Sequence, residues 1–529
     1  MNTIIKNGTI IDGTGSERYK ADLLISDHVI SKIGSNLNFS EIELVDASEM
    51  LVSPGFIDMH SHADLKILEL NKAEAYLRQG VTTIVGGMCG LGLAPANDFV
   101  RKYYTTLVKS IIGSSEFTLF DTLDEFIREI EKKGISPNLA LFIPHGNVRM
   151  SVMGMDDRAP SVKQLDAMKD MIRDGMEAGA FGMSTGLIYP PGNLSKTEEL
   201  IELSKIVSEY DGIYDSHMRN EALDVIKIGM GELVKISKNS NVQAQISHWK
   251  TGINSMWDLT KDMINYAKEA RNGGLKIYAD VYPYEESSTS LVGILLESWV
   301  YKDFRGNLSK DKTRKRILEE IVKNLSSVYF SKVSSEITSE DVAKLIFAYL
   351  KRKIRIISVL HNHNIEGLKL GKALKILYPN VSFPDALLNF MRDEEGSIMI
   401  SIKQMHERKG ILPLLKQDFV CIGSDGFLVK ELNTHPRSYG TFPRILCRYV
   451  REKKMFSFEE AIRKMTSLPA KILGLKSRGK IQEGYFADLV IFDPNYIEDM
   501  ATYANGRQFP RGIKHVFVNG KITVKDSKH

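Results

Sequence analysis

Histidine, cysteine and aspartate residues recur at the ends of short apolar segments along this sequence. The first such segment, "SPGFIDMHSHAD" (53–64), ends in His60 and His62. Because alternate residues of a strand point to the same face, the two rings can face one point. A His-x-His pair at a strand end fits a solvated or hydrogen-bonded pair as well as a metal site. Partners elsewhere in the chain must therefore decide between the two.

Other apolar segments end in residues of the same chemical kind. They are Cys89, His145, Ser184 with Thr185, His217, His248 followed by Lys250, Tyr282 with Tyr284, and Asp425. Imidazole, thiolate and carboxylate groups brought to one point bind a first-row metal ion, and zinc suits this mixture best. The residues at the strand ends therefore predict a zinc site, if the fold brings them together.

The elements that must position these residues alternate between strand and helix. Short apolar runs such as "GVTTIVGGMC", "GIYDSHMR" and "FVCIGSDG" are separated by stretches with helical period. Within 163–179, Leu165, Met168, Ile172 and Met176 share one face, and Gly179 predicts the end of the helix. A helix over 198–212 is expected to bury Leu200, Leu203, Val207 and Tyr210 in the same way.

Eight candidate strands alternating with helices predict an α/β fold of the (β/α)8, TIM-like barrel type. His217 and His248 are 31 residues apart, about one βα repeat. In such a barrel the chemistry lies where the strands end. An open doubly wound sheet is the alternative, and the number of strands favours closure.

Tyr282 and Asp425 are 143 residues apart, far more than one repeat needs. We therefore expect an insertion at about 290–380, before the last barrel strand. It begins with a basic segment of helical period and contains "KIRIISVLH", which predicts an extra strand. Its Lys/Arg run predicts a solvated helix face, with a lid over the site as the alternative.

The two ends of the chain are strand-like and punctuated by turns. Asn7-Gly8 and Asn519-Gly520 both lie between strand-like runs, which predicts a hairpin turn at each. Neither end alone is long enough to bury a two-sided core. We therefore expect 1–52 and 477–529 to form one small β-sandwich domain, and 53–476 to form the barrel domain.

The overall composition of the 529 residues narrows the class of protein. It is 43% hydrophobic and 26% charged, as in globular proteins, and no apolar stretch approaches the roughly 18 residues of a membrane span. The N-terminus breaks at Asn7-Gly8 before a secretory signal could form. A net charge of +4 gives no reason to expect nucleic acid, and three cysteines cannot form a disulfide framework. We expect a cytoplasmic protein with a small-molecule substrate and no membrane partner, and the sequence does not indicate its oligomeric state.

Several segments together carry a family resemblance: "GFIDMHSHAD", "GVTTIVGGMCGLGLAP", "GAFGMSTGLIYPPG", "SHMRNE", "ISHWK", "DVYPY", "PDALL", "IGSDG" and "HPRSYGTFPRIL". With them the sequence resembles the N-acyl-D-amino-acid deacylases (D-aminoacylases) of the amidohydrolase superfamily, over almost the whole chain. The cysteine in "GMCG" is the specific marker, because many relatives use a carbamylated lysine instead. The resemblance implies a zinc-dependent hydrolase that cleaves the linear amide of N-acyl-D-amino acids, giving a carboxylate and a free D-amino acid.

The resemblance also implies roles for individual residues. Cys89, His217 and His248 would hold one zinc ion tightly, and His60, His62 and Asp425 would form a second, weaker position. Asp425 would also take a proton from water and give it to the leaving amine. The groups expected to bind the substrate's α-carboxylate are Lys250, Tyr282, Ser288 and Arg437. For Arg437 a structural salt bridge is an equally good interpretation.

Two other functions remain open. One is an amidohydrolase acting on hydantoin-like rings or small dipeptides, and the other is a non-catalytic scaffold of the same fold. Cys89 and "HPRSYGTFPRIL" favour the deacylase, and the presence of every expected ligand disfavours the scaffold. In "EESST", Glu286 and Ser287 replace the Ala-Gly that the family commonly has, which predicts an altered substrate pocket.

Further motif matches lack the context that their chemistry requires. "GMSTG" (182–186) fits G-x-S-x-G, but Pro190 and Pro191 forbid the helix that must follow a nucleophile elbow. "GGMCGLG" lacks the Lys-Ser/Thr of a phosphate-binding loop. The His-x-His of "HNHN" (361–364) has no apparent partners, and a supporting role for His145 is as good an interpretation as a catalytic one.

Overall fold

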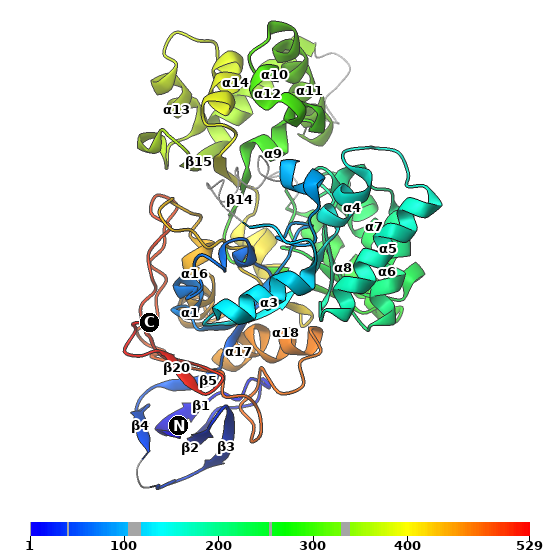
Figure 1. Cartoon of the computed structure of the whole chain (residues 1–529). Coiled ribbons are helices and arrows are strands. Elements are labelled where there is room, and N and C mark those ends of the chain that lie inside the picture. The colour runs from blue at the N-terminus through cyan, green and yellow to red at the C-terminus, as the bar shows by residue number, and fades with distance from the viewer. Residues whose placement is uncertain (1, 40–41, 104–117, 253–256, 330–338) are drawn as a thin grey trace.

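The structure is a computed structural model that describes residues 2–39, 42–103, 118–252, 257–329 and 339–529. Figure 1 shows strands from both termini at one end, alternating strands and helices in the middle, and an inserted unit at the other end. Among the described helices, none combines the length and the apolar character that crossing a membrane requires.

The parallel strands of the middle part follow one another in a closed order. One sheet has the order β6-β7-β8, and another has the order β9-β10-β11-β12-β13-β17. β8 and β9 are separated only by Phe142. The strands are β6 (Phe56–Asp58), β7 (Val81–Gly86), β8 (Asn138–Leu141), β9 (Ile143–Pro144), β10 (Gly182–Gly186), β11 (Ile213–His217), β12 (Gln243–Ile246), β13 (Ile277–Val281) and β17 (Val420–Ile422).

Backbone hydrogen bonds lead from β17 back to the first strand. Met59 N donates to Ile422 O at 3.3 Å, and Asp425 N donates to His60 O at 2.7 Å. Ser61 and Gly426 form a parallel bridge beyond these bonds. The last strand of the order therefore lies beside β6, which an open sheet would not allow.

Helices connect the successive parallel strands. They include α1 (Glu74–Leu77), α3 (Leu123–Lys133), α4 (His145–Met153), α5 (Val162–Glu177), α6 (Thr197–Glu209), α7 (Gly231–Ser240) and α8 (Leu259–Asn272). After β17 come α16 (Arg437–Arg444), the π-helix η8 (Ile445–Glu452), α17 (Phe458–Met465) and α18 (Ser467–Ile472).

α5 shows why these segments are helical. The side chain of Ser161 accepts from Gln164 N and completes a capping box. Met168, Ile172 and Met176 are buried, as the spacing predicts. The prediction for Tyr210 is wrong, because α6 ends at Glu209 and leaves Tyr210 39% exposed.

Strands from both ends of the chain share one sheet, of order β20-β19-β18-β5-β1-β2-β3, with β4 on β1. β5 and β18 join the two ends through antiparallel pairs between Leu51–Pro54 and Leu489–Phe492. The strands are β1 (Thr3–Ile10), β2 (Tyr19–Ser26), β3 (Val29–Gly34), β4 (Glu43–Asp46), β5 (Leu51–Pro54), β18 (Leu489–Phe492), β19 (Ile513–Val518) and β20 (Lys521–Val524).

The two Asn-Gly pairs behave differently. Asn519-Gly520 connects β19 to β20, as predicted. The hairpin predicted at Asn7-Gly8 is wrong, because this pair lies inside β1 at a bulge where the register with β2 shifts. β1 continues past the bulge because Thr9 and Ile10 pair with β2 on one side and with β5 on the other.

The inserted unit runs from β14 to β16, Glu286 to Lys403, and so is wider than 290–380. Its antiparallel sheet has the order β14-β16-β15. Leu291, Ile321, Ile354, Leu387 and Ile400 belong to an apolar core of its own. Its elements include β14 (Glu286–Ser290), α9 (Leu291–Leu295), α10 (Phe304–Asn307), α11 (Asp311–Tyr329), α12 (Ser339–Lys353), β15 (Ile354–Val359), α13 (Leu370–Leu377), α14 (Phe383–Asp393) and β16 (Ile398–Lys403).

Candidate active site

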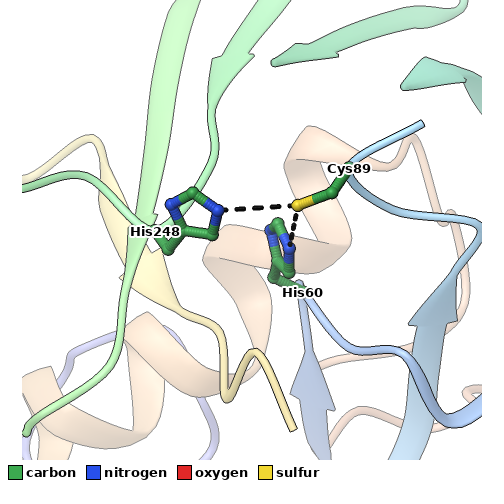
Figure 2. Close-up of side chains that lie close together, drawn as sticks. All are labelled: His60, Cys89 and His248. Carbon is green, nitrogen blue, oxygen red and sulfur yellow. Dashed lines mark hydrogen bonds between the residues drawn. The ribbon is translucent and has the colours of Figure 1, made fainter. Parts of the chain in front are cut away.

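Cys89 lies at the centre of a cluster of histidines at the carboxyl ends of the parallel strands. Its Sγ is 3.3 Å from Nε2 of His60 and 3.5 Å from Nε2 of His248, the two contacts drawn in Figure 2. His217 Nδ1 lies 3.6 Å from the same sulfur and 2.9 Å from Nε2 of His248. The loops after β6, β7 and β12 and the last residue of β11 therefore bring one thiol and three imidazoles together.

Asp425 and His62 extend this cluster. Oδ1 of Asp425 is 3.3 Å from Nε2 of His62 and 3.9 Å from Nε2 of His60. His60 thus lies between the two predicted ligand groups, in contact with Cys89 on one side and close to Asp425 on the other. The six residues predicted as metal ligands form one continuous buried cluster.

Three of these residues have backbone conformations that only glycine adopts easily. φ is +53° at Cys89, +32° at His248 and +52° at Asp425. Such conformations cost about 1–3 kcal/mol each, and they persist where the surrounding structure enforces them. Each side chain is thereby directed from the end of its strand toward the cluster.

The loop that carries Cys89 is fixed by β10. Gly90 N donates to Oγ of Ser184 at 3.0 Å, and that hydroxyl donates to Gly87 O. A methyl group added at Gly186 would collide with the carbonyl oxygen of Cys89. Ser184, which matched the nucleophile-elbow pattern, therefore holds the loop backbone, and no helix follows β10 directly.

Burial sets the protonation of the cluster. It lowers the pKa of His217 and of His248 well below the usual value, so both imidazoles are neutral at pH 7. Burial also raises the pKa of the Cys89 thiol to about 11, although His60 opposes this shift. Burial opposes ionisation of Asp425 too, but the Arg437 guanidinium holds the pKa of that carboxyl well below its usual range.

Three carboxylates that the sequence reasoning missed surround the histidines. Glu221 Oε1 is 3.3 Å from Nδ1 of His248, and its Oε2 is 3.7 Å from Nε2 of His217. Asp280 Oδ2 is 3.4 Å from Nδ1 of His60. Asp215 accepts from Ser247 and groups with His60 and Asp280. Asp215 and Asp280 each interrupt an apolar strand, which is the signal that could have found them.

The predicted substrate-binding residues line a cavity of about 430 Å³ that opens onto the cluster. Lys250 Nζ contacts Glu221 Oε1 and His248 Nδ1, each at 2.8 Å. Arg437 contacts Asp425 Oδ2 at 2.7 Å and donates to Ser288 O at 3.2 Å. The buried hydroxyl of Tyr282 has no hydrogen-bond partner among the described residues. Arg437 therefore forms the salt bridge of one interpretation, and because it also lines the cavity, its binding of the substrate stays a prediction.

Of the other residues singled out in the sequence, Ser287 lines the cavity, and Glu286, His145 and His363 are not among its lining residues. The Glu286 carboxylate accepts from Ser401 and lies 3.5 Å from Arg355. Buried His145 is 2.9 Å from Glu199, which also pairs with Arg149. His363 is largely exposed and lies 3.0 Å from Glu366.

Known proteins are similar to this chain in both sequence and architecture. Residues 413–524 match the model of the Amidohydrolase family. The chain is 30% identical over 522 residues to the N-acyl-D-aspartate deacylase of Alcaligenes xylosoxydans xylosoxydans, covering 98% of this chain and 91% of that protein. The chain belongs to the N-acyl-D-amino-acid deacylase family. The D-aminoacylase of the same organism is 29% identical over 520 residues, covering 98% of this chain and 94% of that protein.

A solved family member has the same architecture. The N-acyl-D-glutamate deacylase of Bordetella bronchiseptica, complexed with zinc and a phosphonate inhibitor, superposes with a TM-score of 0.81. It is 27% identical in sequence, and the match covers 100% of this chain and 99% of that chain. A D-hydantoinase structure, at 17% identity and a TM-score of 0.55, shares the fold alone.

Proposed function

We propose that this member of the deacylase family hydrolyses the linear amide bond of N-acyl-D-amino acids in a zinc-dependent reaction. The products are a carboxylate and a free D-amino acid. The observation that carries the proposal is the buried cluster of Cys89 with His60, His217 and His248, set at the floor of a cavity.

The donors of the cluster fit zinc. Their ligand atoms form groups in which all atoms lie within 4.8 Å of one another. Metal ligation requires neutral imidazole, and burial keeps His217 and His248 in that form. A buried thiol becomes a thiolate when a cation compensates its charge. Cys89, His217 and His248 would hold one zinc ion tightly, and His60, His62 and Asp425 would form a second, weaker position.

A zinc ion held by these residues would supply Lewis-acid chemistry, polarising the scissile carbonyl and lowering the pKa of water at the site toward about 7. Asp425 moves the proton. Its Oδ2 is held by Arg437, so its Oδ1, on the side of the histidines, is the oxygen that accepts the proton of the attacking water. The carboxyl group of Asp425, which is then protonated, acts as a general acid and donates that proton to the leaving amine. The carbon–nitrogen bond breaks as the amine leaves.

The substrate's α-carboxylate meets the two cations of the cavity. Lys250, which contacts His248, and Arg437, which contacts Asp425, both line the cavity and are buried. Further donors are Ser288 and the hydroxyl of Tyr282, for which the described part of the chain offers no hydrogen-bond partner. Together they place the amide carbonyl over the histidines while excluding water from the reacting atoms.

The architecture fits the same assignment. We assign the closed order of parallel strands to a (β/α)8 barrel domain of 53–476, and 1–52 with 477–529 to a composite β domain. Three free, buried cysteines agree with the cytoplasm as the protein's location.

Paired substrates of opposite configuration test the proposal. Amine release by the zinc-loaded protein is measured with N-acetyl-D- and N-acetyl-L-amino acids that carry the same side chains. We expect release from the D series only. Release from neither series would overturn the proposal and direct attention to hydantoins and dipeptides. Release from the L series alone would also contradict it.

A further inference from the structure

We propose, on the basis of the deacylase function above, that the substrate's side chain is apolar and uncharged, and that N-acyl-D-glutamate and N-acyl-D-aspartate are poor substrates. Sequence identity does not distinguish an apolar from an acidic side-chain preference. Relatives that act on D-glutamate and on D-aspartate, and a D-aminoacylase, are 29%, 30% and 29% identical to this chain.

The inserted unit lines the cavity with both apolar and polar residues. Its apolar residues form what we call the apolar wall: Ile294 to Leu296 around the end of α9, Leu325 of α11, and Met399 and Ile402 of β16. Ser287 to Ser290 and Asn324 are its uncharged polar residues in the lining. Leu91 and Ile188 continue this apolar wall from the loops after β7 and β10. A side chain that extends from the amide toward this wall exchanges water for hydrocarbon, which favours apolar groups.

The two cations that line the cavity are already paired with carboxylates of the protein. Among the described residues that line it, Lys250 and Arg437 are the only lysine or arginine. Each lies beside a carboxylate, Glu221 and Asp425 respectively, at 2.8 and 2.7 Å. Both are at the floor, where the α-carboxylate binds. A second carboxylate directed at the apolar wall would find no cation there among the described residues.

A carboxylate lies beside the apolar wall in the cavity lining. Glu297 lines the cavity next to Leu296 and accepts from Asn324 at 2.6 Å. A carboxylate of the substrate would therefore lose its hydration and meet a charge of the same sign. Burial of an unpaired charge is costly, so we expect at least about a 100-fold lower kcat/KM for D-glutamate than for D-leucine substrates.

The experiment compares N-acetyl-D-leucine, N-acetyl-D-methionine, N-acetyl-D-glutamine and N-acetyl-D-glutamate with zinc-loaded wild-type protein. Glutamine has the shape of glutamate without the charge, so it separates charge from size. We expect kcat/KM to fall from leucine and methionine through glutamine to glutamate. Glutamate at or above leucine would overturn this inference while leaving the deacylase function intact. No release from any D substrate would overturn the proposed function itself.

A charge placed in the wall tests the location of the side chain. Ile294→Lys should raise the glutamate-to-leucine ratio of kcat/KM at least about 10-fold above that of Ile294→Gln, because it supplies the missing cation. Ile294→Gln is the matched control for the loss of the apolar group. A ratio unchanged between the two variants would contradict the placement of the substrate side chain against this wall.

Discussion

Asp425 uses its two carboxylate oxygens differently. Oδ2 binds Arg437 at 2.7 Å, and Oδ1 lies 3.3 Å from Nε2 of His62. Asp425→Asn removes the proton acceptor but leaves Cys89, His217 and His248 in place. We expect kcat to fall by about 10²–10⁴-fold, while one tightly bound zinc ion per chain is retained. Steady-state kinetics and metal analysis of the same sample check both expectations, and a near-normal kcat would show that another group moves the proton.

Glu221 lies beside Nε2 of His217 and Nδ1 of His248, the ring nitrogens that face away from Cys89. It also pairs with the ammonium group of Lys250. Such outer carboxylates orient metal-binding imidazoles, and their loss typically costs about 10–100-fold in metal affinity. We expect Glu221→Gln to weaken zinc binding by that factor, as measured by competition with a chelator. Glu202→Gln, a partly exposed surface glutamate that pairs with Lys169, is the control and should bind zinc like the wild type. Equal affinity in both variants would remove Glu221 from this role.

At the scale of residues, the sequence predicted the cluster better than its surroundings. His60, Cys89, His217, His248 and Asp425 were predicted because each stands where an apolar segment ends, and the structure brings them together. The three carboxylates around the histidines were missed because the chain has 66 acidic residues. The sequence indicates burial for few of these 66 residues. The positive φ angles of Cys89, His248 and Asp425 arise from the tertiary structure, so no local pattern predicts them.

Gly186 of β10 shows how one element positions another. Its Cα faces the carbonyl of Cys89, leaving no room for a methyl group. We expect Gly186→Ala to displace the Cys89 loop and weaken zinc binding, as measured by chelator competition. Gly410→Ala is the control, because a methyl group there meets nothing within 4 Å. Wild-type zinc affinity in Gly186→Ala would contradict the tight packing of this loop.

The π-helix η7 (Glu407–Ile411) is joined to the end of η8 by Glu407, which pairs with Arg448 and Lys453. Burial opposes ionisation, but hydrogen bonds from Arg448 and Lys453 lower the pKa of Glu407 from 4.5 to about 2. Because the pKa is lower in the folded protein, this stabilisation is complete above about pH 4.5 and is lost as the pH falls through about 2.

We therefore expect the free energy of unfolding of the wild type to exceed that of Glu407→Gln by a constant amount above pH 5. The excess should shrink toward zero as the pH approaches 2. Denaturant unfolding of both proteins over this pH range measures it. An excess that does not change with pH would show that the ionised carboxylate contributes nothing.

Local patterns predicted elements only where tertiary pairing agreed with them. Asn519-Gly520 forms the predicted turn, because β19 and β20 pair with each other on either side of it. Asn7-Gly8 has the same residues, yet β2 and β5 pair with β1 beyond it and extend the strand through a bulge. Local sequence could not distinguish the two, since the deciding partners lie elsewhere in the chain.

At the scale of the whole molecule, the site is assembled from distant parts of the chain. The cluster draws on the strand ends from β6 to β17, and residues of the inserted unit line much of the cavity. Figure 1 shows this unit at the end of the molecule opposite the strands from the two termini. The alternation of strands and helices could be predicted because each repeat has its own apolar period. The wall could not, because Ile294, Leu325, Met399 and their neighbours have no strand-end signal and face the site only through the packing of the inserted unit.

The proposed function requires that zinc held through Cys89 drives the hydrolysis. The most direct measurement is amine release from N-acetyl-D-leucine by wild type and Cys89→Ala, each assayed after chelation and again after zinc is restored, with zinc content measured at each stage. We predict that the wild type loses its activity with its zinc and regains both. Cys89→Ala should regain neither, because the thiolate at the centre of the cluster is gone. A Cys89→Ala protein that holds zinc and hydrolyses the substrate at the wild-type rate would contradict this role of Cys89.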